Sequence, residues 1–252
     1  MIRVEELRKV YGDTAVVDGV TLDLPEGGVV SIVGANGAGK STMLTMVARL
    51  LDPTAGRVMV DGVDVRAHRG EELARRLSIL TQSNHTAVRL TVADLVAFGR
   101  FPHSRGRLTV EDRRKIREAM AYLDVTQYAG RYLDELSGGQ RQRAYVAMVL
   151  AQDTPYVLLD EPLNNLDMRH AVAMMRLLRR TADELGRTVV LVVHDINIAS
   201  CYSDRIVAMK DGIVVHDGAP DQIMRPDVLR EIFGLDIAVQ HIDGRLIATY
   251  YD

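Results

Sequence analysis

One stretch limits the fold of this chain more than any other, a glycine-rich loop between a predicted strand and a predicted helix. The loop fits the pattern G-x-x-x-x-G-K-[ST] at every fixed position, and it reads Gly34-Ala35-Asn36-Gly37-Ala38-Gly39-Lys40-Ser41, followed by Thr42. An apolar run at 29–33 precedes it, and residues 41–50 have helical spacing. Because spacing and flanks agree, we interpret the stretch as a phosphate-binding loop rather than a chance glycine-rich turn.

The residue types in this loop suit a nucleoside triphosphate. Glycines let backbone N–H groups turn inward around a phosphate without Cβ clashes. The helix N-terminus adds a partial positive charge, and Lys40 adds a full one. Ser41 offers a hydroxyl to Mg²⁺. The sequence therefore predicts a site for a triphosphate with Mg²⁺.

The pattern of apolar residues predicts an α/β fold. Residues 1 to about 30 alternate like strands, with turns at 12–13 and 25–28. Continuous apolar strands are predicted at 156–159 and 188–193, with a helix at 169–185 between them. Such strands indicate a parallel sheet that is covered on both faces. In the tail we expect short strands around residues 212 and 218, a helix near 220–233 and last strands near 240–250.

From about residue 88 the pattern of apolar residues changes from strand-like to helical. Thr91 and Thr109 resemble helix starts, because each is followed three residues later by an acid, and 91–99 and 109–124 have helical spacing. We therefore expect a core lobe from 1–87 and 152–252 with a helical lobe, 88–151, inserted into it.

Two acids, Asp160 and Glu161, follow the predicted strand at 156–159. In a phosphate-loop protein, the acid at the carboxyl end of a strand can hold Mg²⁺ directly or through water. Glu161 then lies where it could polarise a water for attack on the γ-phosphate. An Asp-Glu pair after a strand is often only a solvated turn, but the loop at 34–41 favours the chemical role.

A second anion site is predicted where Leu136-Ser137-Gly138-Gly139-Gln140 opens a helix. Ser137 is a suitable N-cap, and the two glycines leave the first N–H groups uncovered. A simple capped helix start would look the same. However, a chain with one phosphate loop has no evident use for a second triphosphate site of its own. We therefore expect a head-to-tail homodimer in which each second site meets the nucleotide of the other chain.

Residues 136–140 match the signature of ABC-type ATPases, and the resemblance runs through essentially all 252 residues. It implies a P-loop NTPase fold with a RecA-like core, an N-terminal antiparallel β subdomain and an inserted helical subdomain. It also implies ATP hydrolysis coupled to transport. The nucleotide would be held by one chain's loop (residues 34–42) and by Ser137, Gly138, Gly139 and Gln140 of the other.

The resemblance also gives roles to single residues. Tyr11 resembles the aromatic residue that stacks on adenine, although a half-buried strand tyrosine is an alternative. Gln82 resembles the glutamine that touches Mg²⁺ and the attacking water, and His194 resembles the histidine that contacts the γ-phosphate. A lone histidine is usually structural, but this one follows a core strand. The implied catalytic set is Lys40, Gln82, Glu161 and His194, and the implied metal set is Ser41, Gln82 and Asp160.

The segment Asn164-Asn165-Leu166-Asp167 occupies the place of the loop that crosses the dimer in this family. The resemblance assigns Asn165 and Asp167 to that contact. The commonest form of the loop is Ser-Ala-Leu-Asp, so the asparagines depart from it. Because Leu166 and Asp167 are kept, we expect the geometry of the loop to be kept as well.

Three stretches narrow the range of substrates that such a transporter would carry. Residues 96–103 look like the corresponding part of ATPases that serve iron–siderophore, haem and cobalamin importers. Residues 160–168 and 194–202 resemble the siderophore branch. The implied function is the ATPase of an iron–siderophore importer, with a cobalamin or haem importer or a separate-chain exporter as alternatives. The implied partners are membrane permease subunits that dock near Gln82 and the helical lobe and, indirectly, a substrate-binding lipoprotein.

The composition of the chain and the motifs that it carries argue against other functional classes. A net charge of −3 gives no bias toward nucleic acid. No apolar stretch approaches the ~20 residues of a spanning helix, so we expect that another protein would have to hold this one at a membrane. The resemblance implies a peripheral protein on the cytoplasmic face of the membrane. A ribosome- or DNA-acting ABC protein would need two cassettes or a coiled-coil insertion. A phosphate-loop kinase would have no use for residues 137–140. A scaffold would not need both Glu161 and His194.

Overall fold

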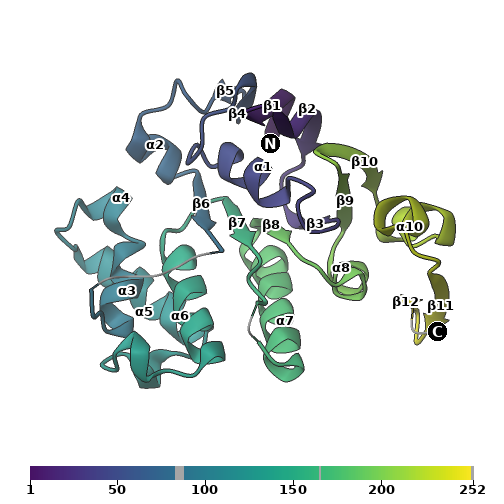
Figure 1. The fold of residues 1–252 in the computed structure, drawn as a ribbon. Coiled ribbons are helices and arrows are strands. Elements are labelled where there is room, and N and C mark those ends of the chain that lie inside the picture. The colour runs from purple at the N-terminus through teal and green to yellow at the C-terminus, as the bar shows by residue number, and fades with distance from the viewer. Residues whose placement is uncertain (83–87, 165, 251–252) are drawn as a thin grey trace.

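The computed structural model describes residues 1–82, 88–164 and 166–250 (Figure 1). A four-stranded antiparallel sheet of order β2-β1-β4-β5 forms one outer layer. Its strands are β1 (Ile2–Tyr11), β2 (Thr14–Leu24), β4 (Ala55–Val60) and β5 (Val63–Asp64). The predicted turn at residues 12–13 is confirmed, because Gly12 has a φ of 55° where β1 turns into β2. A left-handed φ of this kind costs a glycine little.

A six-stranded sheet of order β10-β9-β3-β8-β7-β6 forms the centre of the molecule. It is parallel except that β10 runs antiparallel to β9. Its strands are β3 (Gly28–Val33), β6 (Leu77–Leu80), β7 (Tyr156–Asp160), β8 (Thr188–Val192), β9 (Arg205–Lys210) and β10 (Ile213–Gly218). The apolar strands predicted at 156–159 and 188–193 are confirmed as β7 and β8.

The central sheet is buried on both faces because successive side chains of its strands point to opposite sides. In β3, Val30 and Ile32 pack with the first sheet and with α1 (Lys40–Val47), which lies between the two sheets (Figure 1). Val29 and Val33 pack on the other side, where α7 (Met168–Leu185) and α8 (Ile196–Tyr202) cover the sheet. The carboxyl ends of the parallel strands therefore meet at one edge between these helical layers.

Helices between β6 and β7 gather at one side of the molecule (Figure 1). They are α3 (Val92–Phe98), α4 (Phe101–Ser104), α5 (Val110–Tyr122) and α6 (Gly138–Ala151), with short 3-10 turns at Thr126–Tyr128 and Leu133–Glu135; α2 (Gly70–Ala74) precedes β6. The helix starts predicted at Thr91 and Thr109 are confirmed, since each hydroxyl accepts a bond from the N–H three residues on. Within the part of the chain that the structure describes, no helix combines the length and apolar character that crossing a membrane requires.

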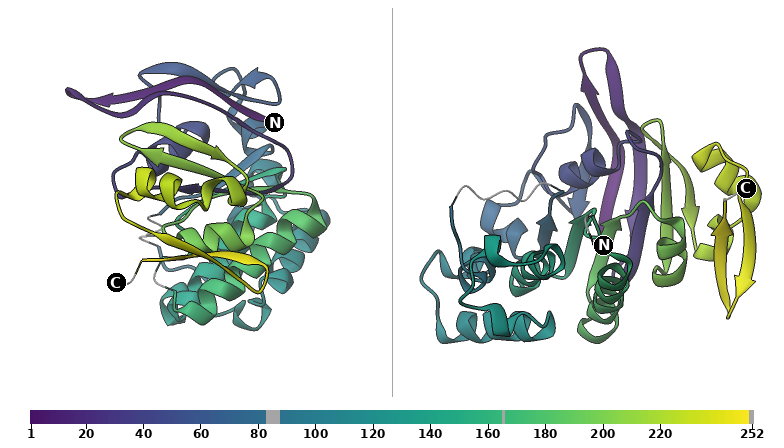
Figure 2. Two further views of the ribbon diagram at one scale, coloured as in Figure 1. Left: turned by 90° about the vertical axis from the view of Figure 1, so that its right-hand side faces the viewer. Right: turned by 60° about the horizontal axis from the view of Figure 1, so that its bottom comes forward.

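The C-terminal region differs from the prediction of one helix near 220–233. Two helices are present, α9 (Pro220–Ile223) and α10 (Pro226–Phe233). Pro226 has no N–H to donate, so it begins a new helix instead of continuing the first. The chain ends in a hairpin of β11 (Ala238–Ile242) and β12 (Arg245–Thr249), which lies beside α8 (Figure 2). The last strands predicted near 240–250 correspond to this hairpin.

Candidate nucleotide-binding site

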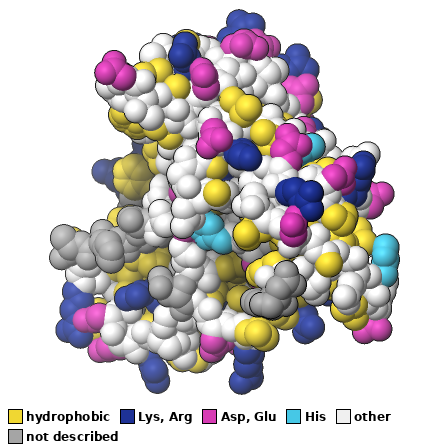
Figure 3. Space-filling view, turned by 45° about the vertical axis from the view of Figure 1, so that its right-hand side comes forward, with side chains coloured by type: hydrophobic (Ala, Val, Ile, Leu, Met, Phe, Trp, Pro, Cys, Tyr) yellow, Lys and Arg dark blue, Asp and Glu magenta, His cyan; other side chains and the backbone are white. Residues whose placement is uncertain are grey.

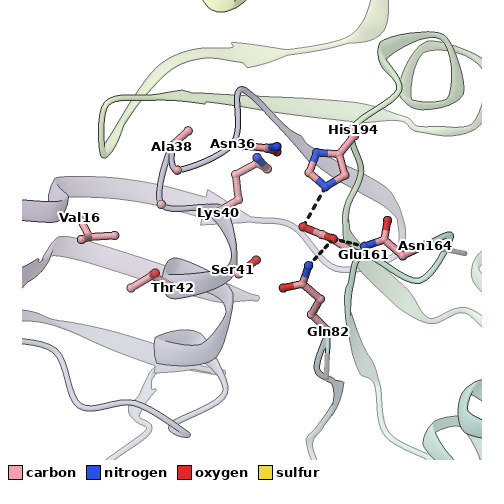
Figure 4. Close-up of a pocket in the computed structure, with 12 residues that line it drawn as sticks. Val16, Asn36, Ala38, Lys40, Ser41, Thr42, Gln82, Glu161, Asn164 and His194 are labelled. Carbon is pink, nitrogen blue, oxygen red and sulfur yellow. Dashed lines mark hydrogen bonds and ion pairs between the residues drawn. The ribbon is translucent and has the colours of Figure 1, made fainter. Parts of the chain in front are cut away.

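A cavity of about 450 Å³ opens at the carboxyl edge of the central sheet (Figure 4). In open α/β sheets this edge is where ligands bind. Its walls come from the β1–β2 region, the loop before α1, and the segments that follow β6, β7 and β8. The lining residues are Val16, Asn36, Gly37, Ala38, Gly39, Lys40, Ser41, Thr42, Gln82, Glu161, Asn164 and His194. All four predicted catalytic residues therefore line the same cavity as the predicted loop, namely Lys40, which belongs to the loop, Gln82, Glu161 and His194.

Two glycines of the loop are required by close backbone packing. Gly34 has a φ of 143°, and a Cβ there would lie 2.0 Å from the carbonyl oxygen of Met209. Gly39 has a φ of 91°, and a Cβ there would lie 2.4 Å from the carbonyl oxygen of Val16. Only a residue without a side chain fits at either point. The loop is therefore held closely between β2 and β9, and its residues 36–42 line the cavity.

The ammonium group of Lys40 is enclosed by the loop that carries it. Lys40 is only 5% exposed, and its Nζ donates hydrogen bonds of 2.8 Å to the carbonyl oxygens of Gly34 and Ala35. Burial lowers the pKa of Lys40, and the nearby carboxylates of Glu161 and Asp160 oppose that shift. The loop thus fixes a cation next to the cavity before any ligand arrives.

Ser41 and Asp160 bring two oxygen atoms together at the start of α1. The Ser41 hydroxyl donates to Oδ1 of Asp160 at 2.7 Å, and Asp160 is 4% exposed. Burial raises the pKa of Asp160. Hydroxyl and carboxylate oxygens are ligands that Mg²⁺ accepts. The described ranges hold no cluster of three or more His, Cys, Asp or Glu side chains that could bind a metal unaided. This donor set fits Mg²⁺, which keeps water and phosphate ligands.

The carboxylate of Glu161 is the meeting point of three polar side chains (Figure 4). Its Oε2 accepts a 2.7 Å bond from Nε2 of Gln82 and another from Nδ2 of Asn164. Its Oε1 lies 2.8 Å from Nε2 of His194. The Glu161 side chain is 9% exposed and its φ is +51°, a sparsely populated conformation for a residue with a side chain. The carboxylate is thereby held in one orientation, facing the loop.

Sequence reasoning did not assign Asn164 or Val16 to this cavity. Asn164 reaches Glu161 because residues 161–164 form a turn in which the Asn164 N–H donates to the Glu161 carbonyl at 3.2 Å. An amide three residues after a catalytic acid is a local signal that could have found it. Val16 belongs to β2, and nothing in its sequence neighbourhood indicates the contact.

The predicted second anion site lies elsewhere on the chain. Ser137 caps α6, because its hydroxyl accepts from the Gln140 N–H at 3.3 Å and the Gln140 side chain accepts from the Ser137 N–H at 3.0 Å. None of residues 137–140 lines the cavity formed by the phosphate loop. Gly139 is buried against a ring, since a Cβ there would lie 2.8 Å from Cδ2 of His170. Within one chain, the predicted anion site at residues 137–140 is therefore not part of the cavity at the phosphate loop.

The predicted dimer-contact residues and Tyr11 do not appear in the lining of the cavity. Asp167 caps α7 and accepts bonds from the backbone N–H of His170 at 2.8 Å and from its ring Nδ1 at 2.7 Å. Asn165 lies outside the described residues. Tyr11, at the end of β1, is 52% exposed, and Nζ of Lys9 lies 5.2 Å from its ring centroid. An exposed ring at this position is accessible to a ligand.

Comparison with known proteins matches the chain to one family over most of its length. The family model described as ABC transporter matches residues 17–164. The petrobactin import ATP-binding protein YclP of Bacillus subtilis is 48% identical over 251 residues and 100% of both chains. FatE of Bacillus anthracis, also a petrobactin import ATP-binding protein, is 51% identical over 95% of this chain and 96% of its own.

More distant relatives and solved structures agree. The ferric enterobactin transport ATP-binding protein FepC of Escherichia coli is 40% identical over 93% of this chain and 87% of its own. Among solved structures, the dimeric bacterial ABC transporter cassette MJ0796 has a TM-score of 0.78 and 33% identity, covering 87% of this chain and 99% of that one.

Proposed function

The chain belongs to the ABC transporter family, and on this premise we propose that it is the ATP-hydrolysing subunit of an importer for ferric siderophore complexes. The observation that carries the hydrolytic part is the cavity in which the phosphate loop faces the carboxylate of Glu161 (Figure 4). Support for the cargo comes from relatives that are named for petrobactin import and that match essentially the whole chain.

Hydrolysis is assigned to the chain's own side chains as follows. The backbone N–H groups of residues 34–42 and the Lys40 ammonium bind the phosphates and offset the charge that develops on them. Glu161 orients the attacking water and accepts its proton. Its orientation is supported by the bonds from Gln82 and Asn164. To His194, whose Nε2 lies 2.8 Å from Oε1 of Glu161, we assign the contact with the γ-phosphate beside that water.

Mg²⁺ is part of this proposal. Ser41 and Asp160, which already share a hydrogen bond, would hold it together with Gln82. When bound, it would supply positive charge to the phosphate oxygens. The hydrogen bond from the Ser41 hydroxyl to Oδ1 of Asp160 keeps these two oxygen atoms side by side.

The working unit is a homodimer in this proposal. Residues 137–140 lie outside the cavity of their own chain, with Ser137 and Gly138 exposed. A second copy in head-to-tail orientation would bring them to the nucleotide, and Asn165 and Asp167 would lie at the contact between copies. Tyr11 would stack on adenine. The solved structure of the related cassette MJ0796 is dimeric.

Membrane partners are assigned to the side of the molecule formed by the helical lobe, residues 88–151, which would move relative to 1–87 and 152–252. Phe98 and Phe101 are 53% and 59% exposed there, and they would offer apolar side chains to permease subunits. The permease subunits would also dock near Gln82. The chain would thus be peripheral on the cytoplasmic face and linked through the permease to a substrate-binding lipoprotein. Acidic and basic side chains are interspersed on the face in Figure 3, so that face has no basic tract for nucleic acid.

Uptake of radiolabelled iron by cells tests this proposal. A strain lacking the chain is supplied with iron-55 bound to petrobactin, to a hydroxamate siderophore or to enterobactin, and is complemented with the wild-type chain or with Lys40→Ala. We expect uptake of at least one complex to be lost and to return only with the wild type. If uptake of all ferric siderophores were undiminished and uptake of haem or cobalamin were lost instead, the proposed substrate would be wrong. The proposed ATPase role would not be affected by that result.

A further inference from the structure

The C-terminal hairpin contacts the helix that follows His194. Asn197, in the first turn of α8, faces Ala248 of β12: its Oδ1 accepts from the Ala248 N–H at 2.6 Å, and its Nδ2 donates to the Ala248 carbonyl at 3.1 Å. Almost one turn later, the Ser200 hydroxyl donates to the carbonyl of Leu246 at 2.9 Å. One edge of β12 pairs with β11. At the other edge, the side chains of Asn197 and Ser200 bond to backbone groups that a third strand would otherwise pair with.

The same helix is joined to the catalytic cavity at its N-terminus. Asp195 caps α8, with its Oδ1 accepting from the backbone N–H of Asn197 at 2.8 Å and of Ile198 at 3.3 Å. His194 immediately precedes this cap, and its Nε2 lies 2.8 Å from Oε1 of Glu161. Asn197 is therefore bound to the cap through its backbone and to the hairpin through its side chain.

His194 itself has little packing to hold it. Its side chain is 41% exposed, so its position depends on the backbone between β8 and α8. α8 has only seven residues, too few for a helix to be stable by itself, so its placement depends on what it packs against. One side of α8 is fixed by the core, where Ile196 and Ala199 are buried, and the other by β12.

We propose that the C-terminal hairpin is a clamp on α8 that fixes His194 beside Glu161, with Asn197 as a positioning residue for hydrolysis. This inference rests on the proposed function of His194. The amide of Asn197 is suited to the task because it is donor and acceptor at once and matches both backbone groups of one strand residue. Ala248 is 3% exposed, so its N–H has no ready replacement partner in water.

A near-isosteric change separates this role from simple packing. Asn197→Asp keeps the volume and the acceptor toward the Ala248 N–H, but it sets a carboxylate oxygen against the Ala248 carbonyl in place of an N–H donor. Gln240→Glu is the matched control, because it makes the same amide-to-acid change at an exposed position of β11 in the same hairpin. Ser200→Ala is a milder variant that removes only the bond to Leu246.

The experiment measures kcat and KM for ATP, together with the midpoint of thermal unfolding, for the full chain and these variants. Asn197→Asp is expected to lower kcat about tenfold while KM stays within about twofold, because displacing a group at the reacting centre costs rate more than binding. Ser200→Ala should lower kcat by a smaller factor, and Gln240→Glu should leave it unchanged. In a His194→Ala background, Asn197→Asp should lower kcat no further.

Two results would overturn the clamp. One is an unchanged kcat in Asn197→Asp and Ser200→Ala despite a lower unfolding midpoint, which would make the hairpin a purely structural cover. The other is a loss of kcat from Asn197→Asp that persists in full without His194. Full activity of His194→Ala alone is a different outcome, because it would remove His194 from the proposed function as well as remove the basis of the clamp.

Discussion

At the scale of single residues, the account depends on how the Glu161 carboxylate is held. Its three polar contacts come from the segments after three different strands, β6, β7 and β8. In its proposed role as the base, a carboxylate held in this way would need little reorganisation when the water loses its proton. The positive φ of Glu161 adds a local conformational cost, which the surrounding contacts offset.

Glu161→Gln tests that role directly. The amide keeps the size of the side chain but cannot accept the proton, so we expect kcat to fall by about 10²–10⁴-fold, the usual worth of a positioned base. Binding of ATP should persist, because the loop at 34–42 is untouched. Single-turnover hydrolysis and binding of a fluorescent ATP analogue measure the two quantities. A kcat within a few-fold of the wild type would remove Glu161 from the mechanism.

A second residue-scale prediction concerns Gly139. Alanine in place of glycine ordinarily stabilises a helix by about 1 kcal/mol. Here the new Cβ would lie 2.8 Å from the His170 ring, so we expect Gly139→Ala to destabilise the chain by about 1–3 kcal/mol instead. Urea unfolding measures the change in free energy.

Two further variants sharpen this test. His170→Ala should recover most of the loss in the double variant, because the ring that the methyl group meets is gone. Gly130→Ala, at a site with nothing within 4 Å, is the control and should be close to neutral. A stabilised Gly139→Ala protein would show that the ring does not confine that position.

At the scale of elements, a buried ion pair ties α6, which begins with residues 138–140, to α5 and to the start of α4. Nε of Arg100, before α4, donates to Asp112 of α5 at 2.9 Å, and another guanidinium nitrogen donates to the carbonyl of Ala151 in α6 at the same distance. Burial alone would raise the pKa of Asp112, but hydrogen bonds from Thr109 and Arg100 outweigh it and lower the pKa from 3.8 to about 2.

Asp112→Asn is therefore expected to cost about 3–5 kcal/mol of unfolding free energy at pH 7, because Arg100 is left buried without its charge partner. A carboxylate with a lowered folded-state pKa stabilises the fold above its unfolded-state pKa. That stabilisation should be full above about pH 4 to 5 and should fade as the pH drops toward 2. Urea unfolding from pH 7 down to pH 3 should show the wild type and variant converging.

Glu118→Gln is the control for this experiment, since the Arg114–Glu118 pair is exposed and solvent screening should leave it little effect on stability. A difference between wild type and Asp112→Asn that stays constant from pH 7 to pH 3 would show that the loss is one of packing rather than of the charged pair.

Local patterns predicted much of the architecture and part of the site. The caps at Thr91, Thr109 and Ser137 depend on residues three positions apart, and the fold class, an ABC-type P-loop NTPase, is confirmed by the solved relatives. The break at Pro226 could have been predicted from its missing N–H. By contrast, the contact of Asn197 with Ala248 joins residues 51 positions apart, so only the folded chain shows it.

At the scale of the whole molecule, the arrangement of the two predicted anion sites is decisive. The phosphate loop, Glu161 and His194 share one cavity, whereas residues 137–140 stand outside it with the N-terminus of α6 exposed. A helix N-terminus that offers free N–H groups attracts phosphate. In a single chain this end lies outside the cavity, and in the proposed head-to-tail pair it would meet the partner's nucleotide.

The molecular mass of the Glu161→Gln chain, measured by light scattering with and without ATP and Mg²⁺, tests this arrangement most directly. Without hydrolysis, bound ATP should hold two chains together, so the mass should rise from the monomer value of 27.9 kDa to twice that value. Adding Ser137→Arg to the same chain should leave ATP binding intact and abolish the dimer. A chain that binds ATP but stays monomeric, or a Ser137→Arg chain that still dimerises, would contradict the shared site.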